Sequence, residues 1–87
     1  MHGGAIATLV DVSMGEAMSS TIEGDGERPV TIEIKVNYLE AGRPGTLVST
    51  AQVLKRGKRF TVIAAEVVQE DDGEVVAEAI GTFTTVG

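Results

Sequence analysis

The residue of this chain that could most directly perform chemistry is Asp11, because it interrupts a long apolar segment. Residues 4–20 include the good helix formers Ala, Leu and Met and contain no proline, so they predict one helix. Apolar residues occur on nearly every side of this helix, which predicts that protein surrounds it. A carboxylate in the middle of a buried helix is costly unless it is paired or functional. Asp11 is therefore a candidate catalytic carboxylate; the alternative is a structural aspartate bonded to a backbone group, to Lys35 or to Arg59.

The helical neighbours of Asp11 favour the first of these interpretations without deciding between them. The residues three and four positions away are Ala7, Thr8, Met14 and Gly15. None of them can neutralise a carboxylate, and most are small. Small neighbours leave room for a ligand beside Asp11.

A second candidate site is the segment His2-Gly3-Gly4 at the start of the predicted helix. A helix N-terminus presents unpaired backbone N–H groups and a partial positive charge, and glycine lets a ligand approach the backbone closely. Such a site suits a carbonyl oxygen or an oxyanion. The alternative is a flexible N-terminal segment that contains glycine.

The spacing of Gly3 and Asp11 restricts how they could cooperate. The two residues are eight positions apart, which corresponds to about 12 Å along a helix, whereas a reacting carbonyl must lie about 3 Å from both its donor and its nucleophile or base. One helix cannot serve one carbonyl with both groups. Two antiparallel copies related by a two-fold axis could, which predicts a site shared between subunits.

A third candidate is the basic run from Lys55 through Arg56, Gly57 and Lys58 to Arg59, which holds four of the seven basic residues. A basic hairpin could bind the phosphates of a nucleotide-like carrier. The alternative is a solvated turn whose charges protect the edge of a sheet.

The elements that position these residues are one helix and four strands. After Pro29 the apolar period becomes two: Val30, Ile32, Ile34, Val36 and Tyr38 are predicted on one face, and Thr31, Glu33, Lys35 and Asn37 on the other. Further strands are predicted over 46–55, 59–70 and 74–85, with turns over 41–45, 56–58 and 71–73. Short connections predict antiparallel neighbours. The chain is expected to be an α+β domain spanning residues 1–87, with a curved antiparallel sheet around the helix and open edges that continue into another subunit or are otherwise protected.

Composition narrows the possible functions. A net charge of −6 and few aromatic residues disfavour nucleic-acid binding. With no cysteine and one histidine, a metal site is not expected. So small a core favours oligomerisation. No targeting or membrane-spanning segment is evident, so a cytoplasmic location is the default expectation.

Taken together, these residues resemble a known family. His2-Gly3-Gly4 followed by six residues and Asp11 is similar to the HGG-x6-D signature of hotdog-fold acyl-CoA thioesterases of the PaaI type, which are related to the 4-hydroxybenzoyl-CoA thioesterases. Residues 30–39 look like the next strand of that family, and residues 53–58 look like its basic hairpin. The resemblance implies a hotdog fold, in which two subunits form one continuous sheet and dimers commonly pair into tetramers.

The resemblance also implies roles for individual residues. Asp11 would be the nucleophile or general base, and the amide of Gly3 or Gly4 would polarise the thioester carbonyl. Thr31 would orient the attacking water. The hairpin of Lys55, Arg56, Gly57 and Lys58, together with His2, would bind the CoA substrate, and no metal or redox cofactor is implied.

One departure from the family pattern concerns the N-terminus. Family members usually carry some forty further residues before the HGG segment, often with an Asn or Gln that helps to orient the substrate. The chain is expected to be a fragment or to have lost its first strand. A non-catalytic acyl-CoA-binding module remains an alternative, and a dehydratase is disfavoured because His2 is the only histidine. The sequence does not specify the acyl group.

Overall fold

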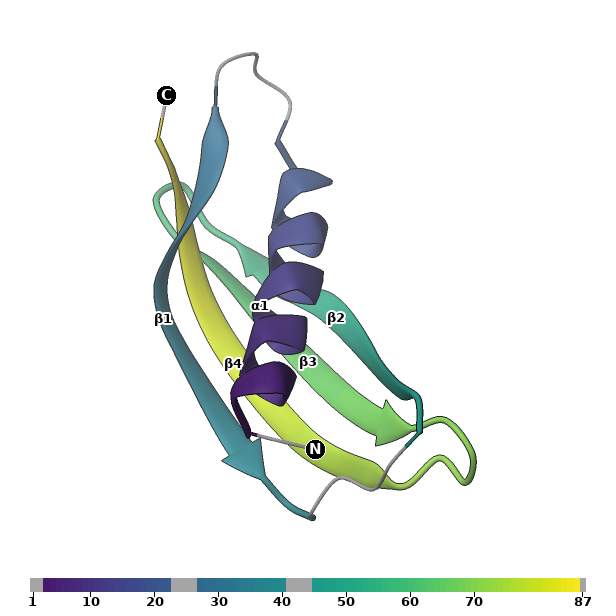
Figure 1. Ribbon diagram of the computed structural model, residues 1–87. Coiled ribbons are helices and arrows are strands. Elements are labelled where there is room, and N and C mark those ends of the chain that lie inside the picture. Colours follow the sequence, from purple (N-terminus) through teal and green to yellow (C-terminus); the bar gives the residue numbers. More distant parts are fainter. Residues whose placement is uncertain (1–2, 23–26, 41–44, 87) are drawn as a thin grey trace.

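The computed structural model describes residues 3–22, 27–40 and 45–86, which form one helix and four strands (Figure 1). The helix α1 spans Gly3–Ser19. The strands are β1 (Arg28–Tyr38), β2 (Leu47–Arg56), β3 (Thr61–Gln69) and β4 (Val75–Val86). The helix and all four strands predicted from the sequence are therefore confirmed, with boundaries that differ by one or two residues.

The strands form a single antiparallel sheet in the order β1-β4-β3-β2. The prediction that short connections join neighbouring strands is right for β2–β3 and β3–β4 but wrong for β1 and β2, which form opposite edges of the sheet. Strand β1 pairs with β4 instead, so β1 and β2 lie on opposite sides of the β3–β4 pair (Figure 1). The turn predicted over 41–45 lies outside the described residues except for Gly45, which has a φ of 127°.

The helix packs on one face of the sheet through a stripe of residues four positions apart. Ile6, Val10, Met14 and Met18 have at most 2 % of their surface exposed. This spacing places them on one side of a helix, and the alternating inward residues of β3 and β4 complete the core beneath them. The core residues contributed by the sheet are Ile63, Ala65, Val67, Val76, Ala77, Ala79 and Phe83.

Strand β1 contains a bulge that reverses its alternation. Thr31 pairs with Phe83 of β4 and Glu33 pairs with the next residue, Thr82, so Ile32 is an extra residue. Because paired residues share a face, Thr31 lies on the helix side with the buried Phe83. The strict alternation predicted from the sequence placed Thr31 on the opposite face, and the bulge makes that prediction wrong.

One helix covered by a curved four-stranded antiparallel sheet confirms the predicted hotdog-type α+β fold (Figure 1). Within one chain the sheet covers one side of α1 only, because Val12 on the other side is 54 % exposed. In the part of the chain that the structure describes, no helix is long and apolar enough to cross a membrane.

Candidate active site

Asp11 lies at the surface of α1, beside the edge strand β1. It lines a groove of about 330 Å³ together with Ala7, Thr8, Thr31, Ile34 and Val36. Asp11 is exposed, so the expectation of a carboxylate buried within the chain is wrong. The sequence suggested burial because α1 has apolar residues all round, but one chain covers only the side that carries the core stripe. The small neighbours Ala7 and Thr8 do leave open space beside the carboxylate, as their size predicted.

Thr31 is the hydrogen-bond partner of Asp11 among the described residues. Its hydroxyl group Oγ1 donates to Asp11 Oδ1 over 3.2 Å, which is long for a bond between two oxygen atoms. The contact depends on the bulge at Ile32, which turns Thr31 toward the helix. The structure thus brings together two residues of the predicted site that are twenty positions apart in the sequence.

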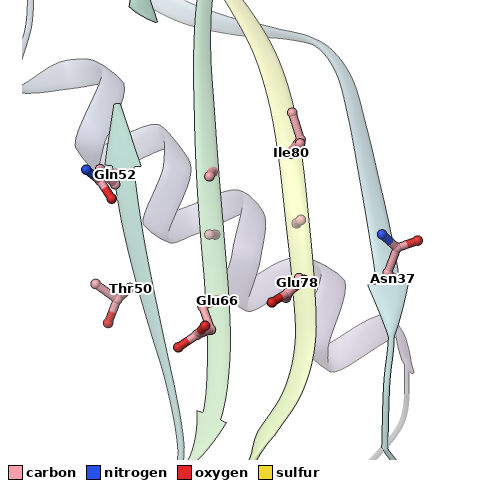
Figure 2. Close-up of a pocket in the computed structure, with 9 residues that line it drawn as sticks. Asn37, Thr50, Gln52, Glu66, Glu78 and Ile80 are labelled. Carbon is pink, nitrogen blue, oxygen red and sulfur yellow. The ribbon is translucent and has the colours of Figure 1, made fainter. Parts of the chain in front are cut away.

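The structural alternatives for Asp11 are not realised within the described residues. Lys35 pairs in register with Ile80, whose side chain lies on the sheet face away from α1 (Figure 2). The backbone carbonyl of Arg59 accepts a hydrogen bond from Thr84 over 2.7 Å. Neither basic side chain forms an ion pair with Asp11 among the residues described, so the carboxylate remains available in the groove.

The start of α1 offers backbone N–H groups in open space. Gly3 is the first helical residue, and the next, Gly4, is exposed. A β-carbon added at Gly4 would meet no atom within 4 Å, so a ligand has room to approach there. Thr8 Oγ1 donates to the Gly4 carbonyl over 2.9 Å and leaves the N–H groups of the first turn unengaged by that side chain. His2, the third member of the predicted motif, lies outside the described residues.

The basic hairpin between β2 and β3 is a tight turn. The Gly57 N–H donates to the Phe60 carbonyl over 2.9 Å, and a β-carbon at Gly57 would lie 2.5 Å from that carbonyl oxygen. Arg56 Nη1 donates to Thr61 Oγ1 over 3.1 Å, so this guanidinium group is held against its own hairpin. Lys55 and Lys58 are exposed.

Within one chain these features are not all close together. The hairpin lies near the end of the sheet where α1 finishes, whereas Gly3 and Gly4 lie at the opposite end (Figure 1). Asp11 is about 12 Å along the helix from Gly3. The structure therefore joins Asp11 to Thr31 but does not join this pair to the helix start or to the basic hairpin of the same chain.

A second hollow, of about 470 Å³, lies on the sheet face away from α1 (Figure 2). Glu66 and Glu78 are register partners at its centre, flanked by Thr50 and Asn37 on the outer strands. Neither glutamate was singled out from the sequence, although alternation along 59–70 and 74–85 places both on the polar face. Among the described residues, no group of His, Cys, Asp or Glu side chains is arranged to hold a metal ion.

This fold agrees with comparisons to known proteins. Residues 1–76 match the model of the thioesterase superfamily, and the chain belongs to that family. Human acyl-coenzyme A thioesterase 13 is 30 % identical over 79 residues, which is 90 % of this chain and 55 % of the human protein.

Two solved structures extend this similarity to three dimensions. The BH2602 protein of Bacillus halodurans, whose structure was determined with CoA, is 34 % identical with a TM-score of 0.92, covering 99 % of this chain and 59 % of its own. The PaaI protein of Escherichia coli is 31 % identical with a TM-score of 0.86 and the same coverage. The chain spans about half of the length of the curated relatives it matches.

Proposed function

We propose that this protein hydrolyses an acyl-CoA thioester to a carboxylic acid and free CoA. The observation that carries the proposal is the exposed Asp11 carboxylate, hydrogen-bonded by Thr31 in an open groove. Membership of the thioesterase superfamily and the CoA present in the Bacillus halodurans structure support the choice of substrate class.

Asp11 is the proposed nucleophile or general base. As a base, it takes a proton from water while the water oxygen adds to the thioester carbon; the tetrahedral intermediate then expels the CoA thiolate, which is protonated to the thiol. As a nucleophile, its carboxylate adds to the thioester carbon and the CoA thiolate leaves, which gives an acyl-enzyme anhydride; water then hydrolyses the anhydride to the carboxylic acid and free Asp11. Thr31 donates its hydroxyl proton to Asp11 Oδ1, so its oxygen can still accept a hydrogen bond from the water. Thr31 thereby fits the proposed water-orienting role.

The proposed partner of Asp11 is the helix start of a second chain. Negative charge develops on the carbonyl oxygen when water or the carboxylate attacks, and N–H groups at a helix N-terminus stabilise such charge. Because Gly3 is about 12 Å along the helix from Asp11 of its own chain, the amide of Gly3 or Gly4 would come from a two-fold related subunit. The active site is therefore proposed to lie at a subunit interface.

The basic hairpin is the proposed contact for the phosphates of CoA. Lys55 and Lys58 are exposed on it, and Gly57 makes the turn tight. Arg56 already donates to Thr61, and its remaining N–H groups are available to a phosphate. His2 is also proposed to assist substrate binding.

A CoA-release assay on a panel of thioesters tests this function. The 87-residue protein and its Asp11→Asn variant are incubated with aromatic, short-chain and long-chain acyl-CoA esters, and free thiol is measured over time. Hydrolysis that depends on Asp11 is expected for at least one ester class. Tight binding of the esters without any release of thiol would instead identify a non-catalytic acyl-CoA-binding module.

A further inference from the structure

Gly81 in the middle of β4 lies directly beneath the helical turn that follows Asp11. A β-carbon built at Gly81 would lie 2.8 Å from Met14 Sδ and 2.9 Å from Phe83 Cε1. Ordinary contacts between such atoms are about 3.5 to 4.0 Å long. The Met14 side chain and the Phe83 ring therefore occupy space that the side chain of any other residue would need.

The contact at Gly81 belongs to the same packing layer as the groove. Gly81 pairs in register with Ile34, which lines the groove beside Asp11. Phe83, the next inward residue of β4, pairs with Thr31. Ile34 Cγ1 would also lie 3.3 Å from a β-carbon at Gly81. Added bulk at this position would press on the helix and on the strand that carries Thr31.

The turn of α1 from Asp11 to Met14 contacts both edge strands of the sheet, β1 and β2, and also the central strand β4. Asp11 accepts the hydrogen bond from Thr31 of β1, and Ser13 Oγ lies 2.7 Å from Ser49 Oγ of β2. Met14, with no exposed surface, fills the space over β4 between these two contacts. Met14 is therefore the buried contact between this turn and the centre of the sheet.

The hydrogen bond from Thr31 to Asp11 tolerates little displacement. Its length of 3.2 Å already exceeds the usual 2.5 to 3.0 Å between hydroxyl and carboxylate oxygens. A methyl group at Gly81 would require Met14 Sδ to move by about 0.7 Å to reach an ordinary contact. A movement of α1 by that amount along the line of the bond would separate the two oxygen atoms to about 3.9 Å, beyond hydrogen-bonding distance.

We infer that Gly81 is a positioning residue: by lacking a side chain it holds α1 close enough to the sheet for Thr31 to bond Asp11. Glycine inside a strand commonly marks such a close approach. Only the kinetic test of this inference rests on the proposed function, because it measures hydrolysis. The hydrogen bond itself is measured without substrate, so failure of the proposed function and failure of this inference are distinguishable.

The first test is a double-mutant cycle on unfolding. Thr31→Val and Asp11→Ala are made singly and together, in the wild-type background and in the Gly81→Ala background, and free energies of unfolding are measured with urea. Coupling between Thr31 and Asp11 is expected in the wild-type background and is expected to vanish in the Gly81→Ala background. Coupling of equal size in a folded Gly81→Ala protein would show that Met14 merely changes rotamer, and would overturn the inference.

The second test uses hydrolysis of whichever CoA ester the protein cleaves. Gly81→Ala and Thr31→Val are each expected to lower kcat about tenfold with little change in KM, and their combination is expected to be no worse than either alone. Independent effects that multiply would contradict a shared mechanism. Val67→Ala is the control for lost stability: Val67 is fully buried on β3, and its truncation should destabilise the fold while both coupling and kcat persist.

A rescue variant covers the case in which Gly81→Ala does not fold. Met14→Val lacks an atom at the Sδ position, so combining it with Gly81→Ala removes the closest of the predicted clashes. Recovery of the fold and of the coupling between Thr31 and Asp11 is expected. If the double variant folds without the coupling, or remains unfolded, the height of α1 is not set by the contact between Gly81 and Met14.

Discussion

The carboxylate of Asp11 combines two properties that hydrolysis requires, since it is open to a ligand and is held by a neighbouring hydroxyl. Exposure lets the substrate reach the groove, and the hydrogen bond from Thr31 restricts the rotation of the carboxylate. An exposed carboxylate gives up little hydration, so its retention in the free chain costs little stability. Changes at this pair should therefore affect catalysis far more than folding.

Asp11→Asn is expected to reduce thioester hydrolysis to near the background rate. The amide cannot act as a nucleophile or remove a proton from water, while its shape is almost unchanged. The free energy of unfolding should change by no more than about 1 kcal/mol, because Asn can still accept the hydrogen bond from Thr31. CoA release and urea denaturation measure the two effects. Wild-type turnover in this variant would remove Asp11 from the proposed mechanism.

Thr31→Val is expected to lower kcat about tenfold while the protein remains folded. Valine keeps the volume of threonine but has no hydroxyl to orient water or the Asp11 carboxylate, and one such hydrogen bond contributes about 1 to 2 kcal/mol to the barrier. Steady-state kinetics on a CoA ester provide the measurement, with Thr31→Ser as the control that keeps the hydroxyl. An unchanged kcat for Thr31→Val would make Thr31 a structural residue only.

The same two residues show what the sequence could and could not predict about the site. The small helical neighbours of Asp11 are a local signal, and they correctly predicted open space beside its carboxylate. The approach of Thr31 is not local, because a bulge of one residue in β1 decides which face it occupies. Alternation alone gave the wrong face, and Thr31 entered the predicted site through family resemblance. Gly81 was missed, although a glycine inside a predicted strand was a usable signal.

At the scale of elements, the helix and strands were predictable because each has a clear period and clear turn residues. Gly73, for example, has a φ of 73° and donates its N–H to the Gln69 carbonyl over 2.8 Å at the predicted turn between β3 and β4. The order of the strands was less predictable. Pairing of β1 with β4 depends on how the sheet closes around α1, and no pattern within β1 indicates its neighbour.

Replacing Arg56 and Lys58 by alanine is expected to raise KM for CoA thioesters without a comparable change in kcat. These charges are proposed to bind phosphates that lie far from the reacting carbon, so they contribute binding in both the ground state and the transition state. A short thioester without the nucleotide serves as the control substrate and should be affected little. The difference between variant and wild type should shrink at high salt, where phosphate contacts are screened.

The two positions of the hairpin can also be separated. Arg56 donates to Thr61, so Arg56→Ala removes a contact within the hairpin as well as a charge, whereas Lys58→Ala removes an exposed charge. A loss of unfolding free energy is expected from the first substitution only. Equal effects of the double variant on both substrate types would show that the hairpin does not contact the nucleotide.

At the scale of the molecule, one chain leaves much of its apolar surface open. The far side of α1 exposes Val12, and the edge strand β1 exposes Ile32; both are 54 % exposed. Both edges of the sheet lack a neighbouring strand in the described chain. We propose that a second subunit covers this region. This agrees with the distance of about 12 Å between Gly3 and Asp11 along α1, which prevents both residues of one chain from reaching the same carbonyl. The oligomer is expected to be a dimer or a dimer of dimers.

Mixing two inactive variants tests whether the site is shared. Asp11→Ala removes the carboxylate, and Gly3→Pro removes an amide at the first helical position, where proline is tolerated. In a mixed dimer one site receives both defects and the other receives neither. Refolding equal amounts together gives half mixed dimers, so about a quarter of wild-type activity should return if the sites are independent.

The mixing experiment requires that each variant alone be folded and have the oligomeric state of the wild type, which sedimentation can establish. The chains are unfolded and refolded together because exchange of intact subunits can be slow. If two well-folded variants regain no activity on mixing, then Asp11 and Gly3 either act within one chain or do not cooperate. The proposed interface site would then have to be replaced by a different arrangement.

The bulge in β1 lets this strand accept one change of length that a regular strand would not. Ile32 is largely exposed, so many side chains could replace it without disturbing the core. Deleting Ile32 would leave Thr31 paired with Phe83 and Glu33 paired with Thr82, so strict alternation would return with Thr31 still on the helix side. Deleting Lys35, which pairs in regular register, would instead place Ile34 and Val36 on opposite faces of the sheet. Of these two deletions, only that of Ile32 should therefore leave the groove beside Asp11 intact.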